Sequence, residues 1–85
     1  MPKCDFTLDF TGTAEDLVAK LKSEIESHNG TFDKDTATFS IKIFLFGKIT
    51  GSYVISGQQI RILIGQKPGS ITCDQIEEKT KEFIN

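Results

Sequence analysis

Residues 31–66 read TFDKDTATFSIKIFLFGKITGSYVISGQQIRILIGQ, and this stretch decides the fold. Apolar and polar residues alternate through most of it, which is the period of a β-strand that buries one face. The alternation predicts four antiparallel strands in a meander. Its large apolar residues then share one face of the sheet: Phe32, Phe39, Ile41, Ile43, Leu45, Ile49, Tyr53, Ile55, Ile60, Ile62 and Ile64.

The turns set the register of this meander. We expect a two-residue turn at 34–35, which places Phe32 opposite Ala37. At the last hairpin, Gly57-Gln58 suits a type II′ turn, because glycine tolerates the positive φ of its first central position.

The turn between the second and third strands of the meander can be tested for consistency. A two-residue loop at 47–48 puts the apolar residues of the two strands on opposite faces. A three-residue loop at 46–48 pairs Leu45 with Ile49 and keeps them on one face. Since a slip of one residue inverts the whole set, we expect the three-residue loop.

A strand and a helix precede the meander, and a second helix follows it. Residues 4–10 alternate as a half-buried strand. Thr13 is a good N-cap for a helix whose apolar stripe runs over residues 17–25, and Asn29-Gly30 can end it. After a turn at 67–69, Thr72 and Gln75 form a capping box that opens a helix from residue 73 to residue 84.

The order β-α-β-β-β-β-α predicts one α+β domain over residues 1–85. With strands numbered along the chain, strand 1 must join an edge of the meander. Placing it beside strand 5 makes a five-stranded antiparallel sheet of order 1-5-4-3-2 with both helices on one face. One face of this sheet is apolar and the other is mostly polar, which fits helices on one side only.

This order resembles a minimal helix-grip or TATA-binding-protein-like fold, which implies no single function. The runs GTFDKDTATFSI at 30–41 and GKITGSYVISGQQIRILI at 47–64, with the Lys-Pro turn before the last helix, also resemble small bacterial proteins of a polyhydroxyalkanoic-acid-system family. That resemblance implies association with apolar polyester granules and carries no catalytic residues.

Composition narrows the function classes. The 85 residues carry a net charge of −2, and no basic stripe that would neutralise phosphates is visible, so we expect no nucleic-acid binding. No run approaches the length of a membrane span, and the first residues alternate in place of a signal peptide's apolar run. We therefore expect a cytoplasmic protein without cofactor or metal.

The two cysteines, Cys4 and Cys73, could lie close, because the second helix begins near the start of strand 1. For a cytoplasmic protein we expect reduced, packed thiols, with a disulfide or a redox-active pair as the alternatives. We expect His28 to lie in the last turn of the first helix, where its protonated form interacts favourably with the helix dipole. The alternative is a catalytic base. We expect the acids to be solvated turn and edge residues: Asp5, Asp9, Asp33 and Asp35.

Some apolar residues fall on the polar face or at a hairpin tip: Phe44, Phe46, Val54 and Leu63. Local cross-strand packing explains them, and so does a contact patch for another surface.

We therefore expect a non-enzymatic interaction module that uses this outer face to contact itself, a protein partner or an apolar granule. The alternative is a small carrier that holds an apolar ligand between sheet and helices, near the inner aromatic residues, which are more simply explained as core: Phe6, Phe10, Phe32, Phe39, Tyr53 and Phe83. Nothing in the sequence pairs a nucleophile with a base, so we expect no enzyme.

Overall fold

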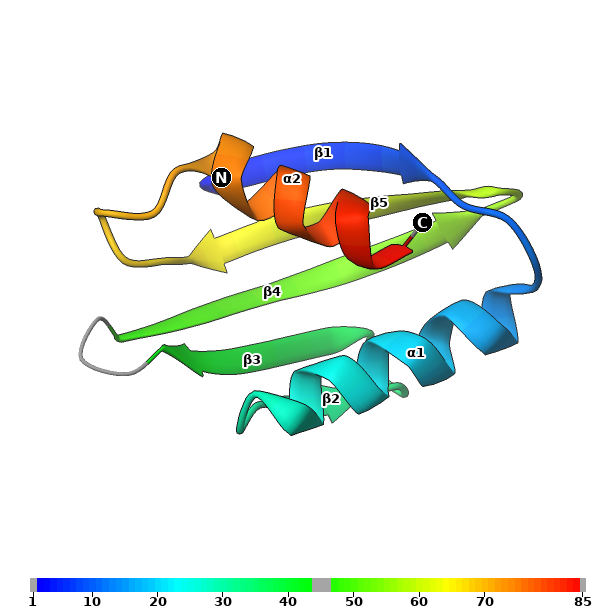
Figure 1. Cartoon of the computed structure of the whole chain (residues 1–85), viewed down its shortest axis with the longest axis horizontal. Coiled ribbons are helices and arrows are strands. Elements are labelled where there is room, and N and C mark those ends of the chain that lie inside the picture. Colours follow the sequence, from blue (N-terminus) through cyan, green and yellow to red (C-terminus); the bar gives the residue numbers. More distant parts are fainter. Residues whose placement is uncertain (1, 44–46, 85) are drawn as a thin grey trace.

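A computed structural model describes residues 2–43 and 47–84 of the chain. Five strands form one antiparallel sheet of order β1-β5-β4-β3-β2, and both helices cover the same face of it (Figure 1). The predicted α+β fold and strand order are confirmed. The elements are β1 (Cys4–Asp9), α1 (Ala14–Ser27), β2 (Thr31–Asp33), β3 (Thr38–Ile43), β4 (Gly47–Ser56), β5 (Gln59–Gln66) and α2 (Cys73–Ile84).

The sheet faces are oriented as the alternation predicts. Ile60, Ile62 and Ile64 of β5 are buried, and Ile62 is only 4% exposed. Val54 of β4, which pairs with Arg61, faces the other way and is 54% exposed. The helices therefore cover the aliphatic face, because burying that face is the main favourable contribution to folding.

The turn between β2 and β3 differs from the prediction. Phe32 pairs with Phe39 and not with Ala37, so residues 34–37 form a longer connection. The cause is the side chain of Asp33, whose Oδ1 accepts hydrogen bonds from the backbone N–H groups of Asp35 and Thr36, at 2.9 and 3.3 Å. Such an Asx turn competes with a tight two-residue hairpin. Ala37 then takes a left-handed φ of 56°.

The predicted pairing of Leu45 with Ile49 is also wrong. Ile49 pairs with Ile41, and Gly47 pairs with Ile43, so the connection moves by two residues to 44–46, outside the described residues. An even shift keeps each side chain on its face, which explains why the orientation was right although the register was not. The last hairpin is confirmed: Ser56 pairs with Gln59, and Gly57 has a φ of 59°.

Both helix starts follow the sequence signals. The Thr13 hydroxyl accepts from the backbone N–H of Asp16 at 3.1 Å. At α2, Thr72 Oγ1 accepts from the N–H of Gln75, while the Thr72 N–H donates to Gln75 Oε1, which is the reciprocal pattern of a capping box. Within the described residues, neither helix has the length and apolar character needed to cross a bilayer.

Candidate functional site

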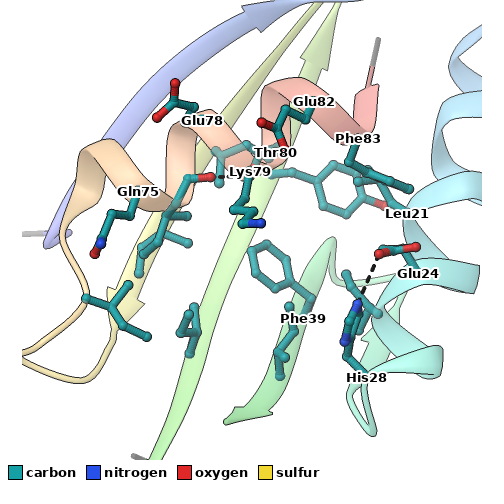
Figure 2. Close-up of a pocket in the computed structure, with 18 of the residues that line it drawn as sticks. Leu21, Glu24, His28, Phe39, Gln75, Glu78, Lys79, Thr80, Glu82 and Phe83 are labelled. Atoms are coloured by element: carbon teal, nitrogen blue, oxygen red, sulfur yellow. Dashed lines mark hydrogen bonds and ion pairs between the residues drawn. The ribbon is translucent and has the colours of Figure 1, made fainter.

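A groove of about 590 Å³ lies between the two helices, with the inner face of the sheet as its floor. Figure 2 shows α2 along one side of it and α1 along the other. The floor is apolar and is made by strand residues: Phe32, Phe39, Ile41, Ile49, Tyr53, Ile62 and Ile64. Leu21 and Ile25 of α1 and Ile76 and Phe83 of α2 supply the walls.

The groove exists because the two helices pack near opposite edges of the sheet. α1 packs on β2 and β3, and α2 packs on β1. Gly30 brings the end of α1 close to β3, since a Cβ at this position would collide with the Ser40 carbonyl oxygen and with Ile25. At the other edge, α2 begins at Cys73, which is bonded to β1. The two helices therefore stand apart over the centre of the sheet.

Gly51 shapes the centre of the floor. It pairs with Phe39 of β3, and a Cβ built on it would lie 2.8 Å from the Phe39 ring. The ring therefore uses the space that a side chain at residue 51 would occupy. Next to Gly51, the pairing of β4 with β5 shifts by one residue, a β-bulge that locally bends and twists a sheet.

Tyr53 is the polar group of the floor. Its ring stacks on Phe32 with centroids 5.6 Å apart, and the residue is 7% exposed. Burial, with a smaller contribution from the negative charge of Asp33, raises the pKa of the phenol. The hydroxyl therefore stays protonated at neutral pH and can donate a hydrogen bond.

Polar side chains form the rim of the groove. On α1, His28 Nε2 lies 3.0 Å from Glu24 Oε1. Across the groove, the Lys79 side chain reaches over its middle, above Phe39 (Figure 2). Gln75, Glu78 and Glu82 of α2 complete the rim, which carries both signs of charge.

His28 is the C-cap residue of α1, as its position in the sequence indicated. Its ring is also part of the groove rim through the contact with Glu24, which sequence reasoning did not foresee. The spacing of four residues between Glu24 and His28 could have predicted this contact, because residues i and i+4 lie on one face of a helix.

One further contact connects the two helices. Lys20 Nζ lies 5.7 Å from the centre of the Phe83 ring, within the range of a cation–π interaction. This contact joins α1 to the C-terminal turn of α2.

Two residues of the predicted contact patch can be placed on the outer face. Val54 is exposed and Leu63 is half-buried, beside a shallow hollow that also includes Pro2 and Ser52. Phe44 and Phe46 lie outside the described residues. Among the described residues, the patch consists of two aliphatic side chains on adjacent strands.

Two of the acids that were expected to be solvated, Asp5 and Asp9, accept hydrogen bonds from side chains of β5. Arg61 donates from Nε and Nη2 to the two carboxylate oxygens of Asp5, at 2.9 and 2.6 Å, and this hydrogen bonding lowers the Asp5 pKa. Gln59 donates to Asp9 at 3.0 Å. Both pairs join β1 to β5. Within residues 2–43 and 47–84, no three acidic, His or Cys side chains gather to hold a metal ion.

Cys4 and Cys73 form a disulfide, so the expectation of reduced thiols is corrected. The reason is topological: β1 pairs with β5, and the connection after β5 returns α2 to the start of β1. The juxtaposition was predicted, and the bond was the alternative left open.

Comparisons with protein-family models, with curated proteins and with solved structures found no match to this chain.

Proposed function

We propose that this chain binds a small amphiphile, with its linear apolar chain in the groove between α1 and α2 and its polar head at the rim. The observation that carries the proposal is the groove itself, with an apolar floor and a polar rim. Its volume of about 590 Å³ lies within the range of roughly 300–1,000 Å³ typical of small-molecule sites. This is the carrier function that was the alternative in the sequence analysis.

The side chains of the groove support an alkyl chain as the occupant. Phe39, Ile41 and Ile76 are only partly buried although they belong to the covered face of the sheet or the inner side of α2. A ligand chain that covers them removes apolar surface from water on both partners. Each buried methylene contributes about 0.8 kcal/mol, or roughly fourfold in affinity.

A chain-length series tests this directly. We expect linear alcohols from hexanol to tetradecanol to displace a dansyl-labelled undecanoic acid, with affinity rising roughly fourfold per methylene until the groove is full. Beyond that length the gain should stop, because further methylenes stay in water. A flat series would contradict the proposal.

A matched pair of variants locates the site. Ile41→Gln places an amide on the groove floor, and Val54→Gln makes the same kind of change on the opposite face of the sheet. We expect Ile41→Gln to weaken probe binding about tenfold, because the amide loses its water when the chain enters. Val54→Gln should bind as the wild type does. Equal effects of the two variants would contradict the groove as the site.

The outer face supports a second candidate function, the contact with a second copy, a protein partner or an apolar granule. The observation in its favour is the exposure of Val54 next to the half-buried Leu63. Replacing both with Thr should preserve the fold and abolish self-association, measured by sedimentation. Two results together would rule out this function: the wild-type protein is monomeric at all concentrations, and the double variant still binds every partner of the wild type.

The family resemblance and the cytoplasmic location remain predictions. A disulfide persists in oxidising compartments, so Cys4–Cys73 favours such a compartment over the cytoplasm. Alkylation mass spectrometry of freshly lysed cells decides between the two: blocked thiols in the native protein support the oxidising compartment, and two labelled thiols support the cytoplasm.

A further inference from the structure

We propose that the Cys4–Cys73 disulfide controls the groove: it holds α2 in place as one wall, and its reduction by a dithiol releases α2 and the bound amphiphile. The inference rests on the proposed function, since it concerns the regulation of the same site. The bond joins the first residue of α2 to β1 across 69 positions of sequence.

The packing of α2 shows why it depends on this bond. Only Ile84, near its last turn, is buried, whereas Ile76, Thr80 and Phe83 on its inner side are half-buried. α1 by comparison buries three residues of its stripe. A helix of 12 residues is marginal in water without tertiary contacts. The disulfide therefore secures the end of α2 that side-chain burial secures least.

The two cysteine residues differ in their exposure to solvent. Cys4 is 3% exposed within β1, while Cys73 is half-buried at the start of the helix. A thiolate can therefore reach the sulfur of Cys73 more easily than that of Cys4. This asymmetry decides the direction of the exchange.

The reaction is thiol–disulfide exchange with a dithiol as the electron donor. One thiolate of the dithiol bonds to Cys73 Sγ, the Cys4–Cys73 bond breaks, and Cys4 leaves as a thiolate that takes a proton. The second thiolate of the dithiol then attacks the first sulfur of the dithiol, which is bonded to Cys73 in the mixed disulfide, and Cys73 leaves as a thiolate that takes a proton. The protein gains two electrons and two protons, and the dithiol becomes a disulfide.

Reduction breaks the bond between the start of α2 and β1, so that only the connection at 67–72 joins this end of the helix to the sheet. The noncovalent contacts that remain are the buried Ile84 and Phe83 under Lys20 at the other end of α2, with only partly buried side chains, Ile71 and Ile76, near its start. Ile76, near the start of the helix, then loses its fixed place beside the groove. A ligand chain held between the helices loses the contacts that this residue and its neighbours supply.

Hydrogen exchange and probe binding, measured on the same samples, test the switch. On reduction with dithiothreitol we expect residues 73–84 to lose much more protection than residues 14–27, whose loss should not exceed the drop in global stability. Binding of dansyl-labelled undecanoic acid should weaken about tenfold, as expected from the loss of one or two buried apolar contacts. Reoxidation should restore both.

The double variant Cys4→Ala/Cys73→Ser is the matched control. It should behave as the reduced protein does and should not respond to dithiothreitol, which excludes an effect of the reductant on the probe. Equal binding by oxidised and reduced protein overturns the switch and leaves the proposed function standing. Equal loss of protection in α1 and α2 also overturns it, because the bond then acts only on the stability of the whole domain and α2 does not open separately. No binding by the oxidised protein overturns the proposed function itself.

Discussion

The two helices lie on the same face of one sheet but are held there by different means. α1 buries Leu17, Leu21 and Ile25 and ends at a glycine that brings it against β3. α2 buries Ile84 and is joined to β1 by the disulfide at its other end. Burial acts along the whole length of α1, whereas α2 is secured at its two ends. The groove follows from this difference, because α2 leaves apolar strand residues only partly covered.

The largest expected effect concerns the bond of α2. Removing it with Cys4→Ala/Cys73→Ser should lower the free energy of unfolding by about 2–4 kcal/mol, because a long loop is no longer constrained in the unfolded chain. Urea unfolding followed by circular dichroism measures the change. A midpoint unchanged within error would mean that noncovalent contacts alone hold α2, contrary to the comparison.

The second-largest expected effect is the difference in stability loss when an inner side chain of each helix is truncated. Leu21→Ala in α1 is expected to cost about 3 kcal/mol, the typical value for a buried leucine. Ile76→Ala in α2 should cost about 1 kcal/mol, since this side chain is half-buried. Thermal unfolding of the two variants gives the comparison. If both lose the same stability, α2 is packed as firmly as α1.

The N-caps offer a smaller test. Thr13→Ala should lower global stability by about 1 kcal/mol, because it removes the acceptor for the Asp16 N–H. Thr72→Ala removes an equivalent acceptor, but we expect α2 to open without the rest of the domain, so the effect should appear in the hydrogen exchange of residues 73–84. A global loss as large as that of Thr13→Ala would show that α2 unfolds only together with the sheet.

The smallest effect concerns β1, the strand on which α2 packs. The Arg61 guanidinium holds the pKa of Asp5 below its ordinary value of 3.8, so the pair stabilises the fold above that pH. Its contribution should disappear as the pH falls from 3.8 through the lower pKa of the folded protein. Asp5→Asn should flatten this part of the stability curve, measured by thermal unfolding in acid. An unchanged acid limb would mean that the pair contributes nothing to β1.

Local signals explain which parts of the fold were predictable. The alternation of β1 and β5, the cap at Thr13 and the capping box at Thr72 involve residues close in sequence, and all were found where they were expected. The hairpin at 57–58 was predictable for the same reason, since its glycine sits inside the turn that needs it. Each of these features needs only a few neighbouring residues.

The register errors had a different origin. The Asx turn of Asp33 lengthened the connection before β3, and in the pairing of β3 with β4 it is Ile41, not Leu45, that lies opposite Ile49. Several registers satisfy the same two-residue period, and the choice among them depends on how strands pack side by side. The groove was also missed as the main site, because the aromatic residues that line it have the composition of an ordinary core.

By itself the sequence determined the α+β class, the strand order, the helix boundaries and the face of the sheet that is buried. These follow from periodicity and capping, which act between near neighbours and depend little on the rest of the molecule. Only the tertiary structure decided the register of β3 on β4, the disulfide between Cys4 and Cys73 and the groove between the helices. Each of these features depends on how residues remote in the chain are placed relative to one another, which is set by the packing of the whole domain.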